Sequence, residues 1–245
     1  MCAIRWSYII SILLILLGAH PAVAAKYTVL EGGVIDGGTV VGRIIFDGTP
    51  PPTRMLKVDE DVEVCGSEDR PSEELLVNSN SGIKNAVLSI EGITSGKQWE
   101  ATGEFVYDQR QCRFVPRMLL IQPKAQGVVL NSDTVGHNFH TISKGIFSVN
   151  KKIKGGAQMK VAKNKIRKPG IIRAKCDMHS WMKGWWIVAE SPYTVITDEN
   201  GNYSIAGIPP GTYTLKLWHE KLGESEQTVV VEANQSTQID MTLEL

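Results

Sequence analysis

The sequence predicts an all-β protein made of two β-sandwiches, the second smaller than the first. Short runs rich in β-branched and aromatic residues recur along the chain, and Gly, Asn, Asp, Ser or Pro separates them, as is typical of sandwiches and barrels. Gly155 and Gly156 interrupt the best helical candidate, at residues 151–168, so no long helix is expected after the N-terminal segment. After Ala189 the chain has a different pattern of turns, with a hairpin turn and a Pro-Gly turn between its strands, which indicates a separate module.

The N-terminus has the pattern of a secretory signal peptide over residues 1–24. Arg5 provides a positive start, residues 8–17 form an apolar run, and Ala22-Val23-Ala24 fits a cleavage site. The run is shorter than the roughly 20 residues that span a bilayer, although an uncleaved anchor is the alternative. We therefore expect a mature chain that starts near Ala25 and is exported, in a bacterium to the periplasm, an oxidising compartment.

Residues 25–84 are expected to form an N-terminal strand and an acidic linker. Residues 39–46 are rich in β-branched side chains and predict a strand, which ends before the prolines at 50–52 because proline cannot continue a hydrogen-bonded ladder. The acidic stretch up to Glu74 shows little periodicity, which indicates loop.

Residues 85–189 are expected to form the larger sandwich. Its predicted strands are short apolar or alternating runs bounded by turn residues, and they cover residues 85–90, 105–107, 118–121, 128–130, 139–142 and 171–174.

Residues 190–245 are expected to form the smaller sandwich as a meander. A hairpin turn at 198–201 and a Pro-Gly turn at 208–211 separate its strands, which are predicted at residues 194–197, 203–205, 213–217, 228–232 and 237–243. About fifty residues are few for independent stability. This module must therefore pack on the first domain or borrow a strand.

The formal net charge is zero, but the charges are segregated. Twelve Lys or Arg and one acid lie between Lys144 and Lys183, whereas eight acids and two basic residues lie between Lys57 and Glu74. The basic stretch surrounds the motif described next and predicts an acidic docking partner, whose binding salt would weaken. A solvated charged face is the alternative. Nucleic acid is not expected for an exported chain.

The motif Cys176-Asp177-Met178-His179-Ser180-Trp181-Met182 contains a thiol, an imidazole and a thioether at intervals of three. These are donors of a blue-copper site, provided that a second histidine joins them. His137 and His140 are the candidates, and strand alternation would let at most one of them bind. Zinc is the competing metal, for which a Met is a poor ligand.

Three cysteines remain in the mature chain, and an odd number in an exported protein calls for an explanation. If Cys176 binds metal, Cys65 and Cys112 are left to form a disulfide. The alternative is two buried reduced thiols.

The Cys-x-x-His-x-x-Met motif before an apolar strand, with His-Asn upstream, resembles the cupredoxins, and its short loop is most similar to that of the amicyanins. The resemblance covers roughly residues 85–189 and implies a Greek-key sandwich. It also implies that His137, Cys176, His179 and Met182 bind one copper ion, and that Asn138 supports the site by hydrogen bonding.

The C-terminal turns, with Ile208-Pro209-Pro210-Gly211 as the clearest, resemble those of carboxypeptidase regulatory-like domains, whose fold is similar to transthyretin. Such modules commonly begin with a Gly-x-Val-x-Gly strand, and residues 38–44 fit this pattern far upstream. We hypothesise that the N-terminal strand pairs into the C-terminal sandwich, so that the first domain is enclosed within the second.

The function expected from these residues is electron transfer through a type 1 copper site, with a c-type cytochrome or another redox protein as partner. His179, on an exposed loop, would be the electron port, and Trp181, Trp185 and Trp186 either surround it or pack in the core. A copper carrier with the same ligands is an alternative, as is a carbohydrate-binding-like module with a vestigial site. We do not expect an enzyme, because four protein donors leave no open position for a substrate.

Overall fold

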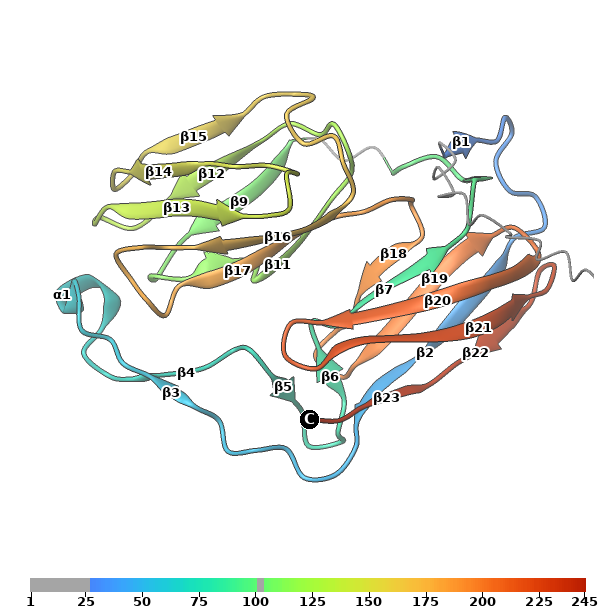
Figure 1. The fold of residues 1–245 in the computed structure, drawn as a ribbon, viewed down its shortest axis with the longest axis horizontal. Coiled ribbons are helices and arrows are strands. Elements are labelled where there is room, and N and C mark those ends of the chain that lie inside the picture. Colours follow the sequence, from blue (N-terminus) through green and yellow to red (C-terminus); the bar gives the residue numbers. More distant parts are fainter. Residues whose placement is uncertain (1–26, 101–103) are drawn as a thin grey trace, which may run out of the picture.

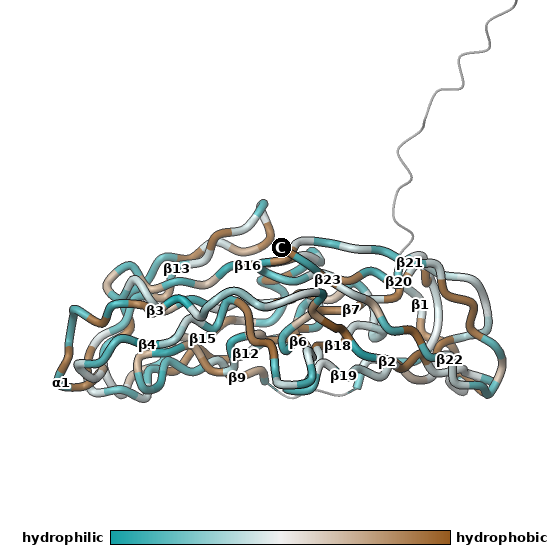
Figure 2. Tube along the Cα trace, turned by 90° about the horizontal axis from the view of Figure 1, so that it is seen from below, coloured by the Kyte–Doolittle hydropathy of each residue, from teal (hydrophilic) through white to brown (hydrophobic). Residues whose placement is uncertain are grey.

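The computed structural model describes residues 27–100 and 104–245, and it is an all-β protein. Two β-sandwiches lie side by side and give the molecule an elongated shape (Figures 1 and 2). The expected signal peptide lies outside the described residues. Within the described ranges, no helix has the length and apolar character needed to cross a membrane.

Sandwich I, at the upper left of Figure 1, contains strands β9 to β17 in two sheets. One sheet has the order β10-β9-β12-β15, with bounds Phe114–Val115, Phe105–Gln109, Gly127–Asn131 and Gln158–Val161. The other has the order β11-β17-β16-β13-β14, with bounds Met118–Ile121, Lys183–Val188, Gly170–Lys175, His137–Ile142 and Asn150–Ile153. Buried side chains of both sheets form one core, in which Tyr107, Phe139 and Trp186 are fully buried.

Sandwich II, on the right of Figure 1, also has two sheets and its own core. The first has the order β18-β7-β20-β21, with bounds Thr194–Ile196, Val87–Glu91, Gly211–His219 and Gly223–Val231. The second has the order β19-β2-β22, and β23 also pairs with β2; the bounds are Asn202–Ile208, Gly38–Phe46, Ser236–Gln238 and Met241–Leu243.

The N-terminal strand β2 lies at the centre of its sheet. It pairs antiparallel with β19 and parallel with β22 and β23, which is the pairing hypothesised from its glycine pattern. Gly42 is required here, because a Cβ at this position would lie 1.8 Å from the backbone oxygen of Ile239. The N-terminal strand β2 therefore completes a sheet of the C-terminal module, which is too short to form the whole sandwich by itself.

The chain enters sandwich I only after a second strand of sandwich II. The sequence pattern places the start of the larger domain at residue 85, whereas the structure pairs β7 with β18 and β20 of sandwich II. Sandwich I is thus inserted between β7 and β18. The difference arises because the sequence of β7, Val-Leu-Ser-Ile-Glu, would suit a strand of either sandwich. Only the strands with which β7 pairs show that it belongs to sandwich II.

The acidic segment is more than a linker. Residues 47–75, which we call the arm, leave sandwich II and reach the far end of sandwich I before they return (Figure 1). The arm contains β3 (Met55–Leu56), the short helix α1 (Val62–Cys65) and β4 (Arg70–Pro71), and β3 pairs with β4. A disulfide joins Cys65 of α1 to Cys112 of sandwich I, as the cysteine count predicted.

Two small pairs complete the structure. After the arm, β5 (Leu76–Val77) pairs with β6 (Ile83–Lys84). Near the N-terminal end of the described chain, β1 (Thr28–Val29) pairs in parallel with β8 (Ser95–Gly96).

The two sandwiches also contact each other directly. Arg117 of sandwich I and Glu220 of sandwich II form a two-pronged ion pair at 2.7 and 2.8 Å, with side chains 9% and 5% exposed. Trp185 packs edge-on against Trp218, with ring centres 5.2 Å apart. The relative position of the sandwiches is therefore fixed by a buried interface as well as by the chain crossovers.

Candidate metal centre

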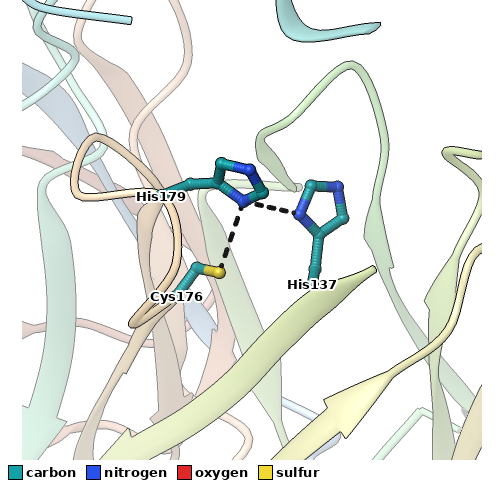
Figure 3. A group of neighbouring side chains, drawn as sticks. All are labelled: His137, Cys176 and His179. Atoms are coloured by element: carbon teal, nitrogen blue, oxygen red, sulfur yellow. Dashed lines mark hydrogen bonds between the residues drawn. The ribbon is translucent and has the colours of Figure 1, made fainter. Parts of the chain in front are cut away.

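The loop between β16 and β17 carries three of the four expected ligands. Cys176 follows the last residue of β16, and Met182 precedes the first residue of β17. The amide of Cys176 donates to the Met182 carbonyl at 3.1 Å, and the amide of Met182 donates to the His179 carbonyl at 3.0 Å. These two bonds close the loop tightly, so that Cys176 and His179 point toward the same space (Figure 3).

The fourth expected ligand comes from a neighbouring strand. His137 is the first residue of β13, and its side chain is buried opposite the loop (Figure 3). Its Nδ1 lies 2.9 Å from Nδ1 of His179, whose Nδ1 is 3.6 Å from Sγ of Cys176. His140 lies elsewhere, where its Nδ1 contacts the carboxylate of Asp177 at 2.9 Å. The structure therefore brings His137, and not His140, to the site.

Both histidines of the site have a carboxylate on their other ring nitrogen. Asp133 contacts Nε2 of His137 at 2.8 Å, and Asp61 contacts Nε2 of His179 at 2.9 Å. A carboxylate accepts a hydrogen bond there, which keeps a proton on Nε2, so Nδ1 is the ring nitrogen available to a metal. The two Nδ1 atoms and a sulfur then converge in a place where both imidazoles are fully buried. This donor set fits a soft or borderline metal cation.

Cys176 is prepared to act as a thiolate. Burial by itself would raise the pKa of this thiol, but hydrogen bonds from His137 and His179 and from the backbone amides of Asn138 and Met178 lower it to about 6. The amide of Asn138 donates to Sγ at 3.2 Å. The thiolate is the form that binds metal.

Asn138 also ties the loop to β13. Its side-chain oxygen accepts the amide of Asp177 at 3.2 Å, and its side-chain nitrogen donates to Asn150 at 2.5 Å. The expected supporting residue thus contacts the ligand sulfur through its backbone and the ligand loop through its side chain.

Met182 is 1% exposed and belongs to the same core cluster as Cys176 and Trp181. Its backbone is held by the loop hydrogen bonds described above. The structure therefore places Met182 in the apolar interior, at the end of the loop that carries Cys176 and His179.

The structure corrects one expectation about the surroundings of the site and decides between the two alternatives for the tryptophans. His179 is not an exposed port, because it is 0% exposed and is covered by Asp61. Trp186 packs in the core and Trp185 at the sandwich interface, so only Trp181 lies beside the site, with its ring 5.0 Å from that of His179.

The lysines that flank the ligand loop are engaged in ion pairs. Lys175 contacts Asp177 at 2.7 Å, and Lys183 contacts Glu74 of the arm at 3.0 Å. They are therefore less available to a partner than their position in the sequence suggests.

Asp61 and Asp133 are the functional residues that sequence reasoning missed. Asp133 could have been found, because it stands four residues before His137 in an Asn-x-Asp turn. Asp61 gave no local signal, since it is one of many acids in an aperiodic segment and meets His179 118 positions later. Asp133, His137 and Cys112 also lie close together, but the sulfur of Cys112 is engaged in the disulfide.

Fold and site together bring two imidazole nitrogens and a cysteine sulfur into one buried group at one end of a β-sandwich, and these three donors could hold a metal ion. Residues 186–244 match the family of carboxypeptidase regulatory-like domains. The match covers all strands of sandwich II that follow the insertion, and it leaves out β2 and β7. No curated protein sequence matches the chain.

Solved structures similar to this chain include a nitrite reductase, an amicyanin and a cupredoxin. A Cu-containing nitrite reductase (NirK) from Thermus scotoductus SA-01 is 21% identical, with 39% of this chain and 24% of that chain covered and a TM-score of 0.33. A reduced Cu(I) form of an amicyanin mutant is 19% identical over 37% of this chain and 86% of that one, with a TM-score of 0.32. A purple cupredoxin from Nitrosopumilus maritimus is 20% identical over 37% and 88%, with a TM-score of 0.27. The similarity therefore spans about a quarter of the nitrite reductase chain.

Proposed function

We propose that this protein is an exported type 1 copper protein that transfers electrons. His137, Cys176 and His179 would be the strong ligands, and Met182 the weak axial one. The observation that carries the proposal is the convergence of two imidazole Nδ1 atoms, 2.9 Å apart, with a sulfur at 3.6 Å from one of them in a buried site. Imidazole and thiolate donors with a long thioether are the ligand set of blue-copper proteins.

For electron transfer, the chain would provide ligands that are held in place by hydrogen bonds and shielded from solvent. When bound, copper would supply a one-electron couple between Cu(I) and Cu(II). Asp133 and Asp61 hold the two imidazoles in the ligating tautomer, and the amide of Asn138 holds the sulfur. Because these residues are fixed before electron transfer, little reorganisation accompanies a change of charge.

The test is a visible absorption spectrum of the mature chain, from Ala25 onward, after addition of Cu(II). We expect an intense thiolate-to-copper band that disappears in Cys176→Ser. Met178→Leu is the matched control, because Met178 lies in the same loop but is 37% exposed, and it should keep the band. An unchanged spectrum in Cys176→Ser, or preferential loading of zinc without colour, would contradict the proposal.

A copper carrier with the same ligands is the alternative function. A carrier must exchange its metal readily, whereas both imidazoles here are 0% exposed and Cys176 is 3% exposed. The burial therefore favours electron transfer. Reversible voltammetry with copper retained in both oxidation states would support it, and loss of copper in one state would support the carrier.

We further propose that the redox partner is acidic, for example a c-type cytochrome. β14 and β15 are edge strands of the two sheets of sandwich I, and the basic stretch places exposed cations on them and between them: Lys151, Lys152, Lys154 and Lys160. Such a surface would attract an acidic protein by electrostatic steering. Lys151→Glu with Lys152→Glu should slow electron transfer with an acidic cytochrome at low salt, and an unchanged rate would reject this docking face.

A further inference from the structure

We propose that Asp61 is a positioning residue for the ligand His179, and that the arm which carries it is a disulfide-anchored cover over the metal centre. This inference rests on the proposed copper site and deepens it. It assigns a role at the site to a segment of sandwich II that lies outside the ligand motif.

The first observation is the direction of the Asp61 carboxylate. Asp61 stands at the N-cap of α1, where an aspartate ordinarily accepts a hydrogen bond from the helix amides. Here its side chain makes no capping bond. Its Oδ2 instead contacts Nε2 of His179 at 2.9 Å, so the residue serves the imidazole and not its own helix.

The second observation is the backbone of Asp61. Its φ of 47° lies in the left-handed region, which is uncommon for residues other than glycine and is associated with functional sites. The backbone amides of Val64 and Cys65 donate to the Asp61 carbonyl at 2.9 and 2.8 Å and hold this conformation. The short helix therefore presents the carboxylate toward sandwich I.

The third observation is the anchor. Cys65, at the end of α1, is bonded to Cys112 of sandwich I. The Cys112 carbonyl accepts Nε1 of Trp181 at 3.1 Å, and the Cys112 amide donates to Asp133 at 2.8 Å. Asp133 in turn contacts His137. The disulfide is thus connected to both ligand histidines, on one side through Asp133 and on the other through α1 and Asp61.

Arg70 fixes the same region from the returning part of the arm. Its guanidinium donates to the carbonyls of Cys65, Gln111 and Cys112. The carboxylate of Asp61 itself is 37% exposed, so its ion pair adds little to stability. Its main effect should therefore be on the ligand and not on the fold.

The contact between Asp61 and His179 should affect metal affinity, solvent access and the reduction potential. A carboxylate on the far nitrogen of a ligand imidazole orients the ring and raises its basicity, and loss of such a partner typically lowers metal affinity by about 10- to 100-fold. The arm also excludes solvent from His179, which is 0% exposed. The added negative charge favours Cu(II) over Cu(I), so removing it should raise the reduction potential.

The experiment compares the copper-loaded mature chain with Asp61→Asn and Asp61→Ala. Both variants should keep the visible band, lose about 10- to 100-fold in Cu(II) affinity, transfer copper to a chelator faster, and have a higher reduction potential. Asp59→Asn is the matched control, because Asp59 lies on the same arm and contacts Lys57 rather than the site. A double variant, Cys65→Ala with Cys112→Ala, should accelerate copper exchange in the same direction.

The outcomes separate this inference from the proposed function. If Cys176→Ser abolishes the band while Asp61→Asn matches Asp59→Asn in affinity, exchange and potential, the copper site stands and the positioning role is refuted. If Cys176→Ser keeps the band, the proposed copper site itself is refuted, whatever the result for Asp61→Asn. Circular dichroism of the metal-free variants checks folding, and an Asp61→Asn chain that does not fold would show a structural role and overturn the proposal.

Discussion

His137 and His179 each have a carboxylate on Nε2, and this arrangement decides that Nδ1 is the ring nitrogen that faces the site. Asp133 is four residues from His137, so the first pairing is local in the sequence. Asp61 approaches His179 from the arm, 118 positions away in the sequence. Two opposing effects act on the pKa of His179. Burial lowers it, but the interactions with Cys176 and Asp61 more than compensate and raise it above its usual value.

Met182→Leu tests the proposed role of Met182 as the axial ligand. Leucine has a similar volume, so the apo-protein should lose less than about 1.5 kcal/mol in its free energy of unfolding. The thioether donor is lost, so the copper-loaded variant should keep its thiolate band but shift it, with a higher reduction potential. Urea unfolding and voltammetry measure the two effects. A potential and spectrum identical to those of the wild type would exclude Met182 as a ligand.

The buried His219 leads us to expect that the stability of the fold depends on pH, even without a bound metal. Burial, and then the nearby charge of Arg117, lower the pKa of His219 to about 4, although a hydrogen bond with the backbone of Lys84 opposes this. In the unfolded chain the pKa is about 6.5. As the pH falls from about 6.5 to 4, the unfolded chain gains a proton that the folded chain does not, so stability decreases.

The decrease should reach about 3 kcal/mol at pH 4, from about 1.4 kcal/mol for each unit of pKa difference. Chemical denaturation of the apo-protein at pH 7 and pH 4.5, compared with His219→Gln, isolates this contribution. Equal pH profiles for the two proteins would contradict the assignment.

At the scale of elements, the arm shows how a segment without regular structure acquires a defined path. Its strands and helix are too short to be stable by themselves. The Cys65–Cys112 disulfide and the contacts of Glu73 and Glu74 with Arg113 and Lys183 hold it against sandwich I. Its acidic composition, read as a loop signal, is what allows these pairings.

Removal of the disulfide by Cys65→Ala with Cys112→Ala should be strongly destabilising. The cysteines are 47 positions apart, and closing a loop of that size in the unfolded chain corresponds to about 4 kcal/mol in the chain-entropy model. Denaturant unfolding under non-reducing conditions measures the loss. A loss below about 1 kcal/mol would mean that the ion pairs alone hold the arm in place.

The whole molecule is organised by an insertion. Sandwich I interrupts sandwich II between β7 and β18, and the arm extends from sandwich II to the end of sandwich I where His137, Cys176 and His179 meet. The two cores are separate. They are connected by the crossovers, by the arm and by the buried Arg117–Glu220 pair.

Breaking that pair should cost more than a surface ion pair. Arg117→Ala leaves Glu220 buried without its partner, so we expect a loss of about 3 to 5 kcal/mol, whereas Arg117→Met with Glu220→Leu should lose much less. A double-mutant cycle by urea unfolding gives the coupling. Single and double variants with the same small loss would show that the pair is not a determinant of the interface.

Local features of the sequence determined the all-β class, most strand positions, the ligand motif and the disulfide partners, because alternation, turn residues and donor spacing act over a few positions. Strands β14 and β15 were not predicted, since Lys-rich edge strands carry little apolar signal. Only the tertiary structure decided that β7 belongs to sandwich II, that His137 rather than His140 faces Cys176 on geometric grounds, and that Asp61 covers His179. These depend on contacts between residues far apart in the chain, and such contacts leave no periodic pattern in a single sequence.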